Sequence, residues 1–263
     1  MVDVGTTPFL AGEAAYAGRD TLVVRDVLRG LRVFRVGAGE GLVLVGATPG
    51  TLRLTALAPV GPAHSLAATL DGDLLCLVHG PRVSVVAALH VGELVTGISR
   101  AVPLEAPQQN TDSSGDGAVQ EQQQQQGEQQ QQQEQGSVLD MGRAEMATRL
   151  FYAGTASGRV LGVLAVTARD HVLLRALEDA LAPAFACITG ASHRAHAAPR
   201  VESSAGGGGS SALGMVDGDL VELVPGLAPR DAARLLQPLG DAAKDAAAFV
   251  PRIAGAVRRG SGA

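Results

Sequence analysis

Three carboxylates in one short stretch have the residue types and spacing that could do chemistry. Asp217, Asp219 and Glu222 lie in the sequence G-M-V-D-G-D-L-V-E, residues 214–222, which we call the signature segment. Acidic side chains this close together could bind a metal ion or transfer protons. The further ligands of a calcium loop are missing from the stretch. We therefore favour a structural role over a metal or acid–base site.

The signature segment also has the pattern of a turn that leads into a helix. Gly218 tolerates a positive φ, and the aspartates on either side of it can accept bonds from local backbone amides. Asp219 then stands at the N-cap position, and Glu222 follows three residues later with the spacing of a capping box. The pattern predicts that these two side chains satisfy amides of the first helical turn.

Other candidate ligands and nucleophiles are sparse. His193 and His196 in H-R-A-H could supply two metal ligands, but no third ligand is near in the sequence, and we favour an exposed polar loop. No serine lies in a glycine-flanked strand-to-helix elbow. We therefore expect no enzyme activity, no cofactor and no metal.

Composition and charge narrow the class of protein. The chain has 263 residues, of which 46% are hydrophobic and 3% aromatic, so a core would be built from Ala, Val and Leu. A net charge of −5 does not favour bulk attraction to nucleic acid. Two distant cysteines, Cys76 and Cys187, indicate a reducing compartment rather than a disulfide framework. No apolar run is long enough to span a bilayer, so we expect no membrane partner.

Short apolar runs separated by turn residues fill the first part of the chain. We expect strands at residues 21–24, 31–36, 42–45, 51–57, 65–69, 74–78 and 83–88, and a hairpin from residues 150–152 and 159–166. Connectors such as Thr48-Pro49-Gly50 and Asp71-Gly72-Asp73 have turn chemistry. The pattern indicates an antiparallel meander, but it fits propeller blades, a sandwich or a barrel equally well.

A glycine-rich stretch, residues 37–41, could be taken for a nucleotide-binding loop. A strand pattern follows it, where the dinucleotide fingerprint requires a helix. We therefore predict a turn between two strands.

Residues 105–138 form a separate low-complexity region rich in Gln. The region holds too few apolar residues to offset the entropy of ordering it, so we expect a disordered insertion in a surface loop between two strands. A helical or aggregating interaction segment is the alternative.

The C-terminal part changes to a helical pattern. Leucines at 173, 177 and 181 predict a helix over 169–181, and two more are expected over 229–236 and 241–259. A Gly/Ser linker precedes the signature segment, near residues 201–213. Three basic residues end the last helix, Arg252, Arg258 and Arg259. They favour the negative end of the helix dipole, and a nucleic-acid contact is the alternative.

The signature segment resembles the C-terminal signature of a known family. The family contains damaged-DNA-binding protein 1, the cleavage and polyadenylation specificity factor A subunit and a subunit of splicing factor 3b. The residues that carry the resemblance are Gly214, Val216, Asp217, Gly218, Asp219, Leu220 and Glu222. Residues 150–181, L-H-V-G-E-L-V at 89–95 and residues 19–36 agree with the family in order and spacing. The resemblance is greatest to the damaged-DNA-binding member.

The resemblance implies a fold that is mainly β with C-terminal α. It implies partial WD40-like β-propeller blades in residues 1–104, last propeller strands in 139–167 after the insertion, and a small helical domain in 168–263. These blades would be the last of the third of three propellers, so the chain would match only the C-terminal part of a family member. The aromatic residues that wedge the helical domain of the family are absent from residues 193–204.

The resemblance also implies a function. It predicts a non-catalytic nuclear scaffold, present also in the cytoplasm, that links substrate receptors to a cullin–RING ubiquitin ligase in DNA repair and protein turnover. The alternative within the family is a nucleic-acid-binding subunit of the polyadenylation or splicing machinery. The expected partners are therefore proteins, substrate receptors and a cullin scaffold, with nucleic acid contacted indirectly.

Overall fold

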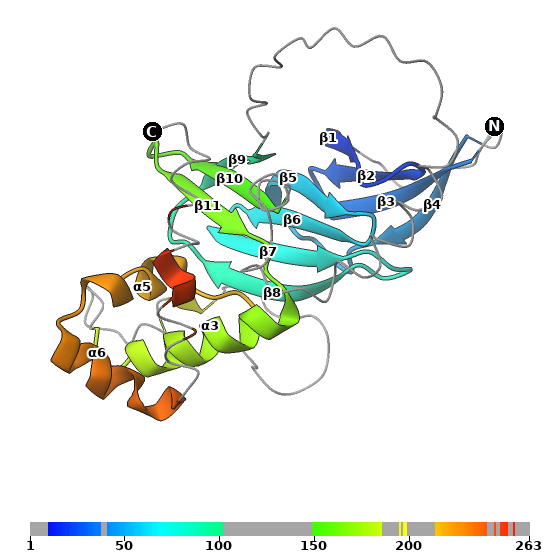
Figure 1. The fold of residues 1–263 in the computed structure, drawn as a ribbon. Coiled ribbons are helices and arrows are strands. Elements are labelled where there is room, and N and C mark those ends of the chain that lie inside the picture. Colours follow the sequence, from blue (N-terminus) through cyan, green and yellow to red (C-terminus); the bar gives the residue numbers. More distant parts are fainter. Residues whose placement is uncertain are drawn as a thin grey trace, which may run out of the picture.

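The fold is mainly antiparallel β with short helices towards the C-terminus (Figure 1). The structure is a computed structural model that describes residues 10–37, 41–101, 149–185, 195, 197–198, 214–240, 245, 248–251 and 255. Within these residues the strands form three separate sheets, and each sheet is a meander in which neighbours in the chain pair antiparallel. The mainly β fold and the helical C-terminal part agree with the sequence prediction.

The three sheets follow one another along the chain. The first sheet contains β1 (Ala11–Tyr16), β2 (Thr21–Asp26), β3 (Gly30–Gly37) and β4 (Gly41–Ala47). The second sheet contains β5 (Leu54–Gly61), β6 (His64–Thr69), β7 (Asp73–Val78) and β8 (Ser84–His90). The third sheet contains β9 (Val95–Arg100), β10 (Leu150–Thr155) and β11 (Val160–Leu164).

The second sheet is buried on both faces because it lies between the other two. Leu57, Ala67 and Leu75 point to one face and pack with Val23 and Val33 of the first sheet. Residues of the opposite parity pack with the third sheet in a second cluster that contains Ala56, Ala58, Leu66, Ala68, Leu74, Val95, Phe151 and Ala153. Runs that are apolar at every position, such as L-L-C-L-V in β7, are typical of strands covered on both sides.

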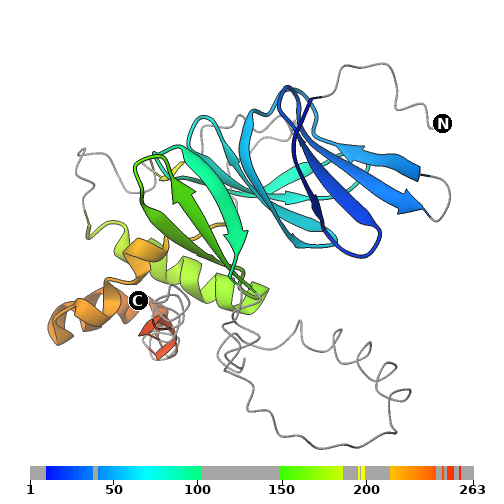
Figure 2. The same ribbon diagram turned by 90° about the horizontal axis from the view of Figure 1, so that it is seen from above.

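The sheets are arranged in chain order with their first strands adjoining. β5 contacts both β1 and β9, which are the first strands of the other two sheets. Figure 2 shows the first, second and third sheets side by side in that order. The small side chains of β5, such as Ala56 and Ala58, allow this close approach on one of its faces.

Two strands were not predicted from the sequence. β1 reads A-G-E-A-A-Y and lacks apolar alternation, and it forms because it pairs along β2. β9 reads V-T-G-I-S-R and pairs with β10 across the insertion, which therefore connects two strands of one sheet. The glycine-rich stretch joins β3 to β4 as predicted, although residues 38–40 lie outside the described residues, as does the Gln-rich region.

The helices begin directly after the third sheet. α3 (Ala168–Leu181) starts at Thr167, whose Oγ1 accepts the N–H of Asp170 and donates to the carboxylate of the same residue at 2.7 Å. α5 (Gly218–Val221), η2 (Val224–Gly226), α6 (Pro229–Leu236) and η3 (Gln237–Leu239) follow. The predicted helices at 169–181 and 229–236 are confirmed.

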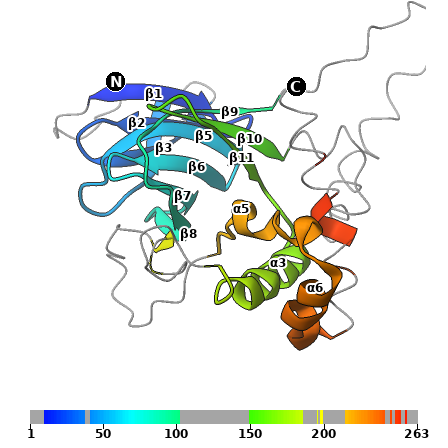
Figure 3. The same cartoon turned by 90° about the vertical axis from the view of Figure 1, so that its left-hand side faces the viewer.

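The helices share one apolar core, which we call the helical cluster. Its buried members are Leu174, Leu177, Leu181, Leu220, Val221, Val224, Leu236, Phe249 and Val250. Residues 245, 248–251 and 255, the described part of the predicted third helix, are helical. Figure 3 shows α5 on the side of this group that faces the third sheet. No helix in the described part of the chain is long and apolar enough to cross a membrane.

Candidate functional site: the signature segment and the first sheet

The signature segment passes from the sheets to the helices in three residues. Gly214 lies against β8, because a Cβ at this position would be 3.3 Å from the Cβ of Ala87. Met215 packs on the apolar cluster shared by the second and third sheets, whereas Val216 packs on the helical cluster. The segment therefore connects the helical cluster to the core shared by the second and third sheets.

Asp217 fixes the turn of the signature segment to α3. Its Oδ1 accepts the N–H groups of Asp219 at 3.0 Å and Leu220 at 3.4 Å. Its own N–H donates to Oε1 of Glu178 at 3.2 Å, and the other oxygen of that carboxylate accepts from Arg175 at 2.6 Å. Glu178 is 5% exposed, so these bonds satisfy a buried carboxylate.

The predicted capping residue was wrong. Asp217, not Asp219, is the N-cap of α5, because its backbone is extended at φ −74° and ψ 106° whereas Asp219 already lies inside the helix. Glu222 is the C-cap, where its N–H donates to Gly218 O, so the pair does not form a capping box. Leu220 and Val221 are each 4% exposed and anchor α5 in the helical cluster.

Asp219 instead faces a charged group on the third sheet. Arg159, after the β10–β11 turn, has Nη2 at 3.8 Å from Oδ2 of Asp219 and Nη1 at 2.9 Å from Oε1 of Glu93. Glu93 also accepts a hydrogen bond from the Ser157 hydroxyl. The Ser157 hydroxyl and then Arg159 lower the pKa of Glu93 from its usual 4.5 to about 2. These contacts join the residues just before β9 and β11 to α5 at the protein surface.

The sequence did not predict the Glu93 group. Glu93 and Arg159 are 66 positions apart, and although each lies in a segment that resembles the family, nothing in those segments indicates that the two side chains pair. The remaining candidates, His193, His196, Arg252, Arg258 and Arg259, lie outside the described residues. Among the residues that the structure describes, no group of three or more His, Cys, Asp or Glu side chains could hold a metal ion.

The first sheet has a second face, which we call the outer face, directed away from the second sheet. One cross-strand row on it joins Tyr16, Leu22, Phe34 and Leu44, which are direct partners from β1 to β4. Tyr16 is 64% exposed and Leu44 is 45% exposed, whereas Phe34 between them is buried. Leu42, the partner of Val36, adds a further side chain that is 39% exposed. The outer face is therefore apolar at its centre and accessible at both edges.

A buried ion pair between Arg32 and Asp26 lies beside this row on the outer face. Arg32 Nε lies 3.0 Å from Oδ2 of Asp26, which is fully buried, and Asp26 Oδ1 also accepts the N–H of Leu28. Because an unpaired carboxylate at this depth would be costly, the pair fixes the β2–β3 turn at the end of the sheet.

Comparisons with known proteins give no family for this chain. A scan against models of protein families produced no match, and a search of curated proteins produced none either.

Proposed function

We propose that the protein is a non-catalytic scaffold that binds other proteins through the outer face of its first sheet. The proposal follows the resemblance of the signature segment to the damaged-DNA-binding and polyadenylation-factor family. Under it, the partners are substrate receptors and a cullin scaffold, and the protein acts in the nucleus in repair and protein turnover.

The arrangement of the sheets supports an interpretation as propeller blades. The first two sheets are four-stranded meanders, the third is a three-stranded one, and β1, β5 and β9 adjoin in chain order. Propeller blades are four-stranded sheets that pack face to face around an axis. The apolar packing on both faces of the second sheet is what a blade between two neighbours requires.

The observation that carries the proposal is the exposure of apolar side chains at the two edges of the outer face. The second sheet buries both of its faces against sheets, while the row from Tyr16 to Leu44 on the first sheet remains accessible at its ends. Exposed large apolar side chains such as Tyr16 and Leu44 at the two ends of this row are candidates for protein–protein contact, although Phe34 between them is buried. Tyrosine is also among the residues that carry most binding energy at interfaces.

Co-purification from cells that naturally contain the protein tests the proposal. The tagged chain is compared with the double variant Tyr16→Asp/Leu44→Asp, which places two charges on the outer face. Val172→Asp is the matched control, because Val172 is an exposed apolar residue, 68% accessible, on α3. Circular dichroism checks that all three proteins are folded.

We expect the wild-type chain and the Val172→Asp control to recover substrate receptors and a cullin, and the double variant to lose them. Recovery of polyadenylation or splicing subunits instead would support the alternative function, a subunit of the RNA-processing machinery. Equal recovery by the double variant would show that the outer face does not bind these partners.

A further inference from the structure

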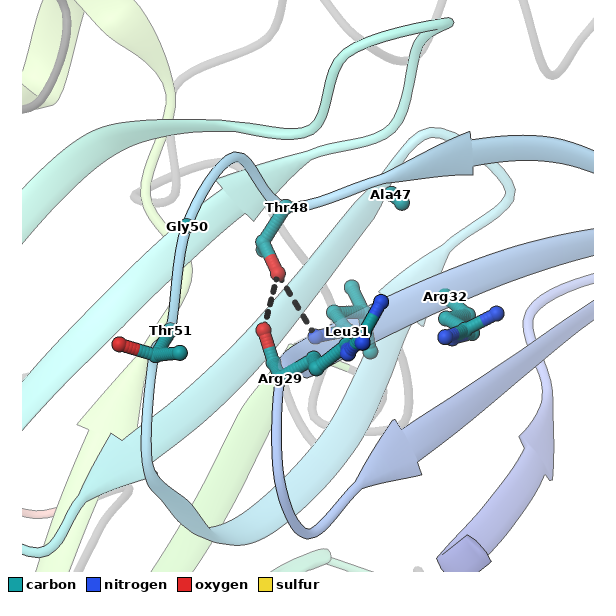
Figure 4. Close-up of a pocket in the computed structure, with 7 residues that line it drawn as sticks. All are labelled: Arg29, Leu31, Arg32, Ala47, Thr48, Gly50 and Thr51. Atoms are coloured by element: carbon teal, nitrogen blue, oxygen red, sulfur yellow. Dashed lines mark hydrogen bonds between the residues drawn. The ribbon is translucent and has the colours of Figure 1, made fainter. Parts of the chain in front are cut away.

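A pocket of about 480 Å³ opens at the end of the first sheet, where the β2–β3 turn meets the loop between β4 and β5 (Figure 4). Small-molecule sites in proteins have volumes of roughly 300–1,000 Å³, so the pocket has the size for a small ligand. Leu31 and Ala47 supply apolar atoms to its lining, and Arg29, Thr48 and Thr51 supply polar ones.

Hydrogen bonds hold the β2–β3 turn against the β4–β5 loop, so the pocket is formed before any ligand binds. Figure 4 shows Thr48 directed towards Arg29 and Leu31. The Thr48 hydroxyl donates to Arg29 O at 3.0 Å and accepts the N–H of Leu31 at 3.1 Å. Gly30 permits this approach, since its φ is +110° and a Cβ there would lie 2.5 Å from the same hydroxyl oxygen.

The positive charge of the pocket comes from Arg29. Arg32 also lines the pocket, but its charge is offset by buried Asp26 at 3.0 Å. The Arg29 side chain is exposed, and in the described part of the chain its guanidinium has no hydrogen-bond or ion-pair partner. Thr51 lines the same pocket, but its hydroxyl is directed away from Arg29 (Figure 4).

We propose that this pocket binds a small organic anion. A carboxylate or phosphate group accepts hydrogen bonds from Arg29, and a short apolar body packs against Ala47. A guanidinium suits this role because its planar array of donors matches the oxygens of either group in a bidentate geometry. The site is separate from the proposed scaffold function and does not depend on it.

Ligand-observed NMR on the full chain tests the proposal with three probes. Butyrate carries a carboxylate and an apolar body, inorganic phosphate carries the anion alone, and 1-butanol carries the apolar body without charge. We expect saturable binding of butyrate, of phosphate or of both, and none of 1-butanol. The anion that binds more tightly identifies which group the site prefers.

Three variants locate the binding. Arg29→Gln should weaken the binding of the preferred anion by about tenfold, because a charge-assisted bond is lost. Thr51→Val, which removes a hydroxyl directed away from Arg29, and Arg53→Gln, which replaces an exposed arginine outside the pocket, should both leave it unchanged. The absence of saturable binding, or equal binding by Arg29→Gln and wild type, would overturn the proposal.

Discussion

Asp217 makes contacts with two helices at once. Its carboxylate caps α5, and its backbone N–H binds the buried carboxylate of Glu178 in α3. The neighbouring Asp219 is the opposite case, with a side chain that is 85% exposed and a single long contact to Arg159. At the residue scale, the two aspartates of one turn therefore contribute very differently to stability.

Replacing each aspartate tests this difference. Asp217→Ala should lower the free energy of unfolding by about 1 kcal/mol, because two amides of the first turn lose their acceptor. Asp219→Ala should change it by less than about 0.5 kcal/mol, as is typical of exposed ion pairs. Urea unfolding followed by circular dichroism at matched protein concentration measures both. A larger effect for Asp219→Ala would restore the capping role that the sequence pattern suggested.

The lowered pKa of Glu93 predicts how its contribution depends on pH. The pKa is 4.5 in an ordinary environment and about 2 in the folded protein, so between these values the unfolded chain binds the proton and the folded one does not. The stability that Glu93 contributes is therefore complete above about pH 4.5 and lost as the pH falls towards about 2.

Comparison with Glu93→Gln isolates this effect from the titration of other carboxylates. Wild type should be more stable than the variant at about pH 6, and the difference should disappear towards about pH 2. Urea unfolding at several pH values measures the difference. A constant difference across this range would show that Ser157 and Arg159 do not hold the ionised carboxylate in solution.

At the scale of elements, the first and second sheets are joined where β4 passes the β7–β8 loop. Val83 N–H donates to Ala47 O at 3.0 Å, and Ala47 forms an isolated parallel bridge with Arg82. Gly46 allows this contact, because a Cβ on it would overlap the carbonyl oxygen of Gly80. The carbonyl oxygen of Gly80 belongs to the backbone, so it cannot rotate away from an added Cβ as the end of a side chain could.

Gly46→Ala should therefore destabilise the protein by about 2 kcal/mol or more, because β4 and the β7–β8 loop must move apart to make room for the added methyl group. Gly97→Ala in β9 is the matched control, because a Cβ at that position meets no atom within 4 Å. Thermal unfolding compares the two variants. If Gly46→Ala were as stable as Gly97→Ala, the close contact between β4 and the β7–β8 loop would not exist in solution.

Elements with local signals could be predicted, and those formed by distant contacts could not. Alternation in β3, Pro229 at the start of α6 and the leucine repeat of α3 are each readable within a few residues. β1 has mostly small side chains, and its strand conformation depends on pairing with β2. The sequence placed the signature segment at a helix start but could not separate two aspartates that flank one glycine.

The candidate site was predictable only in part, for the same reason. The resemblance marked the signature segment, which does connect the sheets to the helices. The partners of its two aspartates, Glu178 and Arg159, lie far away in sequence, and the segment that contains them does not indicate these contacts. The outer face and the pocket depend on strand register, which is set by pairing across four strands.

At the scale of the whole molecule, three sheets and one helical cluster form a continuous series of packed layers. Each sheet is covered by the next, and the signature segment attaches the helices to the last two sheets. The first sheet has its outer face exposed at Tyr16, Leu42 and Leu44. The central claim is that this face binds protein, and that in the absence of another partner it binds a second copy.

Sedimentation velocity of the purified chain tests this claim most directly. At micromolar concentration the wild-type chain should sediment as a dimer or larger species relative to its monomer mass of 26.7 kDa. The double variant Tyr16→Lys/Leu44→Lys should be a monomer, because two like charges on the outer face repel those of a second copy. A wild-type chain that is wholly monomeric, with one sharp and reversible thermal transition, would contradict the claim.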